Sequence, residues 1–230
     1  MKLNKISKLA LSLFSVYALT ATPAHALVTY AADATTTSTI PSLTGFSTDG
    51  AMMDGMQVTA TFSGGLTQTV SWADTGPTSG GVTGSGWGLS LTGDSFAGLW
   101  NFVFSPTAQL GAITQLILNG NTGFTVFDRS LPAPGTNGSA NGHDLSFTDS
   151  TINALVTFSD QVALTGAAPV GDLWHVVTVD FTDGLRGDFA FVQDTDNDSR
   201  ITNRVPEPTV LGLFGIGLLA AGLARKNRKA

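Results

Sequence analysis

The side chains best suited to chemistry lie near the C-terminal end, in the five residues Asp-Thr-Asp-Asn-Asp that begin at Asp194. Aspartates at the first, third and fifth positions of a loop can direct three carboxylates toward one hard cation, as in calcium loops. Ser199 stands where such loops carry glycine, and Val205 stands where a glutamate would close the coordination sphere. Asp194, Asp196 and Asp198 are therefore candidate calcium ligands. The alternative is a solvated polar turn without a cation.

A second group of residues matches the sequence blocks of the lipases and esterases that use a serine, a histidine and an aspartate. Ser95 follows Gly-Asp, and Asp172 precedes His175 by three positions. In such an enzyme Ser95 would attack the substrate, His175 would take its proton and Asp172 would orient the imidazole. That group has helices between parallel strands, and neither such helices nor its Gly-x-Asn-Asp block is evident here. A secreted esterase-like hydrolase is thus the third hypothesis, and the sequence favours a protein that is not an enzyme.

The sequence gives weaker support for the remaining candidate metal-binding and sugar-binding residues. After His25 the chain has only His143 and His175, too few for a convincing zinc site, and it has no cysteine. Trp87 and Trp100 could stack on sugar rings if they were exposed, which would make the chain a carbohydrate-binding module. Tryptophans of a β-sandwich more often fill the core, and this interpretation is favoured for both.

The charge of the chain is concentrated in its central part. Residues 27–206 contain sixteen aspartates and no glutamate against four arginines, a formal charge of −12, whereas the whole chain has −6. All the lysines lie in the two terminal segments. A body of this charge is expected to repel nucleic acid and to attract cations. Without a lysine it also has no phosphate-binding loop of the Gly-Lys type.

The elements that must position these residues are predicted to be strands. Short alternating or apolar runs recur between Gly, Pro, Asn and Asp turn signals, and no amphipathic helix is evident. About nine strands are expected, at 56–62, 66–72, 87–92, 99–105, 112–119, 124–128, 152–159, 173–182 and 188–193. The first two are joined by Gly64-Gly65, which predicts a hairpin. Residues 74–86 and 131–142 are predicted loops. The fold class is therefore all-β, an antiparallel β-sandwich or jelly roll over residues 27–204, with 27–45 a loose arm or an edge strand.

The N-terminal segment has the three parts of a secretory signal peptide. Lys2, Lys5 and Lys8 precede an apolar run, which ends at a small-x-small site formed by Ala24 and Ala26. We expect signal peptidase to cleave after Ala26, so that residues 1–26 are removed and the body is exported.

The C-terminal segment also has three parts. Pro206-Glu207-Pro208 comes first, and the sixteen uncharged, mostly apolar residues 209–224 follow. As a helix these would span roughly 24 Å, a little less than the ~30 Å hydrocarbon layer. The basic residues after them are expected to stop transfer and stay in the cytoplasm: Arg225, Lys226, Arg228 and Lys229.

This arrangement of tripeptide, short apolar helix and basic tail resembles the PEP-CTERM sorting signal, and the resemblance covers residues 205–230 alone. It implies that exosortase, a membrane protease, recognises Pro206, Glu207 and Pro208 and removes the helix. Proteins with this signal are associated with exopolysaccharide and biofilm in Gram-negative bacteria. The expected protein is exported, transiently anchored in the inner membrane and then placed at the cell surface or released, with a structural or adhesive role in the matrix. A permanent single-span anchor is the alternative.

Overall fold

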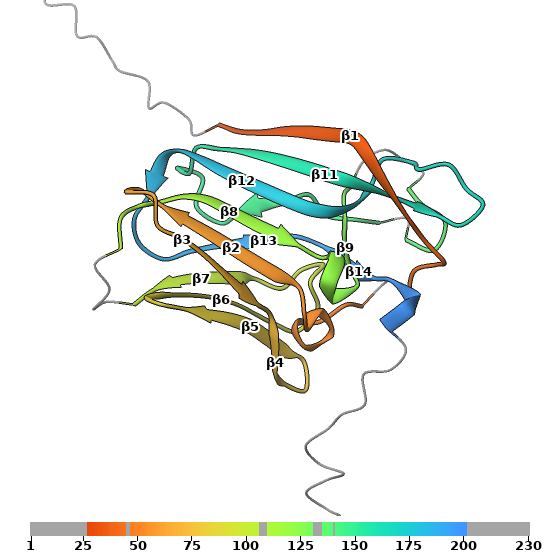
Figure 1. The fold of residues 1–230 in the computed structure, drawn as a ribbon, viewed down its shortest axis with the longest axis horizontal. Coiled ribbons are helices and arrows are strands. Elements are labelled where there is room, and N and C mark those ends of the chain that lie inside the picture. Colours follow the sequence, from red (N-terminus) through yellow and green to blue (C-terminus); the bar gives the residue numbers. More distant parts are fainter. Residues whose placement is uncertain (1–26, 45–46, 106–109, 131–134, 140, 202–230) are drawn as a thin grey trace, which may run out of the picture.

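The computed structural model describes residues 27–44, 47–105, 110–130, 135–139 and 141–201, and these form two stacked β-sheets (Figure 1). The larger sheet has the order β1-β11-β12-β8-β2-β3, with β9 paired to β12 and β14 paired to β9. Its strands are β1 (Val28–Ile40), β2 (Gln57–Phe62), β3 (Thr67–Ser71), β8 (Ile113–Asn119), β9 (Thr125–Asp128), β11 (Ala154–Leu164), β12 (Leu173–Leu185) and β14 (Thr195–Asn197).

The smaller sheet has the order β10-β13-β7-β6-β5-β4. Its strands are β4 (Ala73–Gly76), β5 (Ser79–Gly84), β6 (Trp87–Thr92), β7 (Trp100–Phe104), β10 (Ser146–Phe147) and β13 (Phe189–Val192). Two short 3-10 helices connect strands, η1 (Gly50–Met53) and η2 (Asn121–Gly123), and a third, η3 (Ser199–Ile201), follows β14. The two layers confirm the predicted all-β class.

Buried and partly exposed residues alternate along the strands. Each sheet therefore has one apolar face, and the two sheets stack through these faces. In β2, Val58, Ala60 and Phe62 are buried, and the residues between them are partly exposed. The predicted hairpin is confirmed, since β2 pairs antiparallel with β3 up to Thr61 and Thr67. Gly64 and Gly65 both have positive φ, which glycine adopts without steric cost, so the turn needs these two residues.

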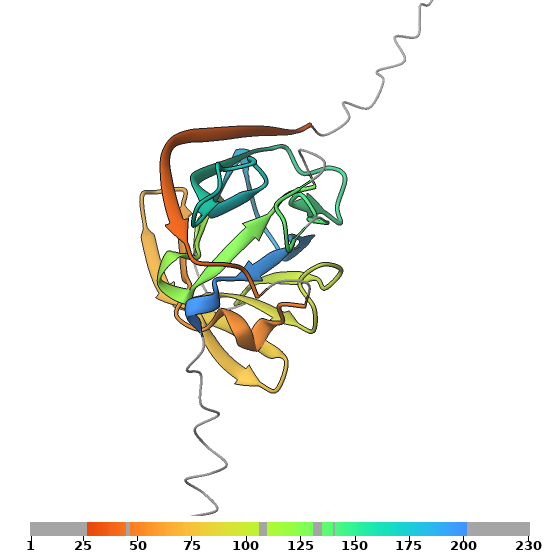
Figure 2. The ribbon, with the colours of Figure 1, turned by 90° about the vertical axis from the view of Figure 1, so that its right-hand side faces the viewer.

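Three predictions about the fold were wrong. The described residues contain fourteen strands rather than about nine. Residues 74–86 are not a loop, because most of them belong to β4 and β5, whose glycines obscure the strand pattern. Of the two alternatives predicted for residues 27–45, the edge strand is confirmed, because residues 28–40 form β1 at the edge of the larger sheet (Figure 2). The third wrong prediction is the purely antiparallel pairing, since β1 pairs with β11 in parallel.

The core lies between the sheets and contains most of the aromatic residues. All four tryptophans are at most 3% exposed. Trp100 stacks on Phe191 at a centroid distance of 5.7 Å, and Trp87 stacks on Phe102 at 5.5 Å. The preference for core over sugar-stacking surface is therefore confirmed for Trp87 and Trp100.

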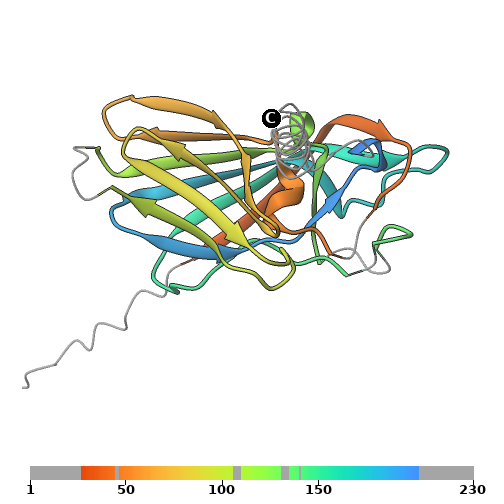
Figure 3. The same ribbon diagram turned by 90° about the horizontal axis from the view of Figure 1, so that it is seen from below.

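The larger sheet extends past the smaller one at the end that holds β9 and β14 (Figures 1 and 3). There, one face of β9, β12 and β14 presents Phe127, Trp174 and Thr195, of which Phe127 and Trp174 belong to the main core. On the opposite face, Val126 and Leu173 pack in a separate small apolar cluster with Ile40 and Val162. This second face also contains the acidic residues of the candidate site.

Candidate functional site

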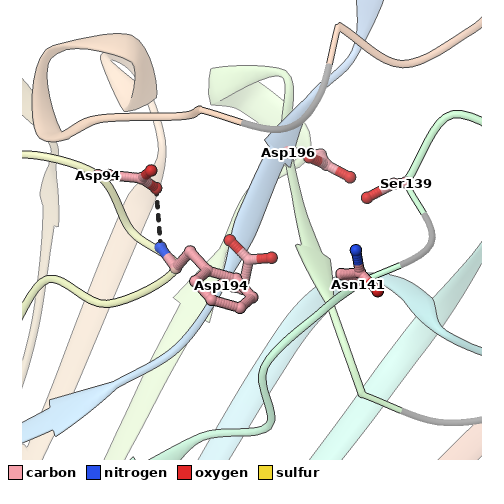
Figure 4. A pocket seen from close by; sticks show the side chains of 6 residues that line it. Asp94, Ser139, Asn141, Asp194 and Asp196 are labelled. Carbon is pink, nitrogen blue, oxygen red and sulfur yellow. Dashed lines mark hydrogen bonds between the residues drawn. The ribbon is translucent and has the colours of Figure 1, made fainter.

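A pocket of about 200 Å³ opens beside β14, and aspartates dominate its wall. Six residues line it: Asp94, Phe96, Ser139, Asn141, Asp194 and Asp196. In Figure 4 the side chains of Asp194, Asp196, Ser139 and Asn141 point toward one shared space. Asp94 stands at the edge, where its carboxylate accepts a hydrogen bond of 3.0 Å from the backbone N–H of Phe96 (Figure 4). None of the six is basic.

Strand pairing brings a fourth carboxylate, that of Asp128, close to the three that line this pocket. In the ladder between β14 and β9, Thr195 is opposite Phe127, so Asp194 is opposite Asp128, and the N–H of Asp128 donates to the carbonyl of Asp194 at 3.1 Å. Residues directly opposite share a face, as do residues two apart on one strand. Asp128, Asp194 and Asp196 therefore face the same side. Like charges in such positions repel, so this arrangement costs stability unless something neutralises it.

Asp128 is fully buried, and only one of its carboxylate oxygens has a partner. Ser139, which lines the pocket, donates from Oγ to Asp128 Oδ2 at 2.6 Å. The other oxygen, Oδ1, accepts no hydrogen bond from any described residue. A carboxylate buried in this way normally carries a proton or faces a cation. The 135–139 segment thus joins the pocket to Asp128, which corrects the prediction that 131–142 is purely a surface loop.

Burial and mutual repulsion raise the pKa of two carboxyls in this group. Desolvation, followed by the charges of Asp196, Asp172 and Asp194, raises the pKa of Asp128 to about 8, although the Ser139 hydrogen bond opposes this. Desolvation and the charges of Asp196 and Asp94 raise the pKa of Asp194 to about 7. Without a cation, both groups hold protons into the neutral range.

These pKa values predict that, in metal-free buffer, the protein loses stability as the pH rises from 7 to 9. An unfolded aspartate has already released its proton at pH 7, whereas folded Asp128 keeps its own until about pH 8. Stability that depends on this proton is therefore lost as the pH passes the folded pKa. We expect a decrease on the order of 1 kcal/mol, or roughly 2–4 °C in Tm, by thermal denaturation.

Asp128→Asn should reduce this loss of stability between pH 7 and 9. An equal loss in the variant would contradict the raised pKa of Asp128 as its cause. The prediction is limited to pH 7–9 because the contribution of buried His175 to stability changes in the opposite direction at lower pH. Desolvation lowers the pKa of His175, so its contribution to stability is lost only as the pH falls below the usual histidine range.

Asp198 does not join the other two predicted calcium ligands in the pocket. Its N–H donates to the carbonyl of Phe124, and its carboxylate forms an ion pair with Arg200. Within the described residues, no three acidic or histidine side chains are grouped as metal ligands. The predicted three-aspartate loop is therefore a strand, β14, followed by an ion-paired turn.

Each of the three residues of the hydrolase hypothesis has hydrogen-bond partners outside that set. Ser95 Oγ lies 3.2 Å from Asp194 Oδ1, and it accepts from the N–H of Thr195. His175 Nδ1 lies 3.2 Å from Asp160 Oδ2, and Asp172 accepts from the hydroxyl of Thr136 at 2.7 Å. All three side chains are buried, and each has different partners.

Sequence reasoning missed Asp128, Ser139 and Asn141. Asp128 ends an apolar strand, and its only local signal is a charged residue at that boundary. Ser139 and Asn141 lie in a Gly- and Pro-rich stretch without periodicity. Their relation to Asp194 depends on pairing between β9 and β14, which are far apart in the chain.

The C-terminal segment, which follows the described residues, matches a known motif. The family model for the PEP-CTERM protein-sorting motif matches residues 204–229. This chain carries a PEP-CTERM sorting signal. The resemblance found in Pro206-Glu207-Pro208 and the segments after it is thus confirmed, and the signal marks an exported protein that is sorted by exosortase with transient membrane anchoring. No curated protein and no solved structure matches the chain.

The predicted membrane helix at 209–224 and the signal peptide at 1–26, with its cleavage residues Ala24 and Ala26, lie outside the described residues. So do the stop-transfer residues Arg225, Lys226, Arg228 and Lys229. In the part of the chain that the structure describes, no helix is long and apolar enough to cross a membrane.

Proposed function

We propose that this chain is a non-catalytic protein of the extracellular matrix, where it has a structural or adhesive role among exopolysaccharides. The observation that carries the proposal is the combination of a folded β-sandwich with a sorting signal at its end. The pairing of Ser95, His175 and Asp172 with other partners supports a role without ester hydrolysis. Burial of the four tryptophans gives the carbohydrate-binding alternative no support from these residues.

Under this proposal signal peptidase releases residues 1–26, and exosortase then acts at Pro206-Glu207-Pro208. The last described residue, Ile201, is five positions before Pro206. An extended chain covers at most roughly 18 Å over that distance. The protease must therefore work close to the η3 end of the sandwich, while the apolar segment holds the substrate in the membrane.

The test is complementation of a strain that lacks the chain. The full chain should appear in the surface or matrix fraction with an intact mass that lacks 209–230, and it should restore matrix biomass. Glu207→Ala should accumulate in the membrane fraction with its tail attached and restore little biomass. Thr209→Ser, next to the tripeptide, is the matched control and should behave like the original chain.

Two results would count against the proposal. A matrix-bound protein that still contains 209–230 would contradict processing. Unchanged biomass in the strain without the chain would contradict the matrix role.

A further inference from the structure

A groove of about 510 Å³ lies on the outer face of the smaller sheet, which is the lower layer in Figure 1. Gly81 of β5 and Gly88 of β6 line it without side chains and form its floor. Val103 of β7 is opposite Gly88 and is 46% exposed, and Ala73 of β4 is opposite Gly81. The residues on the two neighbouring strands therefore border a strip of backbone that is open to solvent.

Packing restricts Gly88 much less than the other glycines of this floor. The residues before and after it on β6 are buried in the core, so Gly88 faces the groove, and its φ is not positive. A Cβ atom on Gly88 would lie 3.2 Å from the Val82 carbonyl oxygen and 3.6 Å from Val103 Cγ2. On Gly81 it would lie 2.6 Å from a backbone oxygen. A glycine inside a strand weakens that strand and often marks a place that a ligand approaches closely.

Four hydroxyl groups on the groove wall are available to a ligand. They belong to Ser71, Thr75, Thr83 and Ser90, all of which are exposed, and none of these side chains forms a hydrogen bond within the described residues. The described residues of the wall also include no charged one, although residues 27–206 together carry −12. The groove thus combines aliphatic surface with hydroxyls and is an uncharged part of an acidic protein.

These features select the kind of occupant. An anionic polymer would be repelled by the acidic body. An added peptide strand needs an open sheet edge, but β5 and β6 pair with each other from Ser79 to Gly84 and from Trp87 to Thr92, and β4 and β7 flank them. A sugar ring has apolar C–H faces and hydroxyls around its edge. It therefore matches an aliphatic floor that is bordered by groups able to donate and accept hydrogen bonds.

We propose that this groove binds a neutral polysaccharide chain. The C–H face of a sugar ring lies on Gly88 beside Val103, and its hydroxyls bond to Thr83 and Ser90. The volume is within the range of roughly 300–1,000 Å³ that is usual for ligand sites. No aromatic ring is among the described lining residues, so one groove binds weakly, and many copies on one surface act together. This inference rests on the proposed matrix role and names the surface that contacts the polysaccharide.

The test is native electrophoresis of the full chain, in mild detergent, through gels that contain polysaccharide from the organism's own matrix. Anion exchange first separates this material into a neutral and an anionic fraction. The neutral fraction should retard the protein, and the anionic fraction should not. Gly88→Val fills the groove and should raise the apparent Kd at least roughly tenfold, with Gly88→Ala between the two.

A second variant keeps the test decisive if Gly88→Val lowers Tm. Thr83→Val removes an exposed hydroxyl while keeping the shape of the side chain, so it should raise the apparent Kd roughly threefold at unchanged Tm. Thr37→Val makes the same change at an exposed position on β1, outside the groove, and should bind like the original chain.

The proposal fails if the neutral fraction does not retard the protein, even where the full chain restores matrix biomass. It also fails if Gly88→Val and Thr83→Val bind as Thr37→Val does, since the polysaccharide would then bind elsewhere. A dimer that forms without polysaccharide and is lost in Gly88→Val would make the groove a contact between two copies instead. Retardation that depends on Gly88, together with unchanged biomass in the strain without the chain, would contradict only the matrix role.

Discussion

Replacing Gly80 with alanine will destabilise this protein by at least about 3 kcal/mol, which lowers Tm by roughly 6–12 °C. A Cβ atom on Gly80 would lie 2.0 Å from the carbonyl oxygen of Gly50 and 2.2 Å from Trp72 Nε1. These two atoms already form a hydrogen bond of 2.8 Å between the core and η1. Neither is the end of a flexible side chain, so relief requires β5 and η1 to separate.

The matched control is Gly76→Ala in the same hairpin. A Cβ at Gly76 would meet only Ser79, at 3.7 Å, so its Tm should change by less than roughly 2 °C. Both proteins can be compared by thermal denaturation and by near-ultraviolet circular dichroism, which reports the environment of the buried tryptophans together. Similar melting of the two variants would show that β5 and η1 can separate at little cost.

Gly80 also shows why the sequence predicted too few strands. Residues 74–86 are rich in Gly, Ser, Thr and Pro, which is typical of a loop. In the structure, Gly80 and Gly81 lie inside β5, where the backbone of a neighbouring segment approaches too closely for any side chain. A glycine can mark either a loop or a strand position that another backbone segment approaches closely. Only the tertiary contact shows which of the two applies.

Strands with clear alternation were predictable because each carries its own signal. Trp87–Thr92 was predicted with the same bounds that the structure gives it. The parallel pairing of β1 with β11 was not predictable, since a polar edge strand has little periodicity and its partner lies far along the chain. Local pattern therefore identified most strands, whereas partners and sheet order depended on long-range packing.

For the candidate site, too, some residues were predictable from local pattern and others depended on long-range packing. Asp194 and Asp196 were identified from their spacing as the first and third positions of a calcium loop. In the structure the same spacing places them on one face of an extended segment. Asp198 has the same spacing, but η3 starts at the next residue and Arg200 takes its carboxylate. Asp128 and Ser139 reach the site only through the pairing of β9 with β14 and through the segment that covers them.

Replacing Trp100 with alanine is the second change for which we expect a large effect, a loss of about 3–5 kcal/mol. Trp100 is 0% exposed and contacts the rings of Trp72 and Phe191 at centroid distances of 5.3 and 5.7 Å. Its Nε1 donates to the carbonyl of Gln193 at 3.0 Å. The Gln193 amide in turn donates to the carbonyl of Asp194 at 2.8 Å, so this tryptophan also supports the backbone of the acidic pocket.

Two further variants separate the contributions of Trp100. Trp100→Phe keeps an aromatic ring but leaves the Gln193 carbonyl without its donor, so the cost should fall to roughly 1–3 kcal/mol. Phe96→Ala removes a ring that is 44% exposed and should change stability by less than about 1 kcal/mol. Denaturant unfolding measures all three variants. If Trp100→Ala instead kept its stability and lost polysaccharide binding, Trp100 would be a sugar-stacking residue, because a core tryptophan cannot be removed without leaving a cavity.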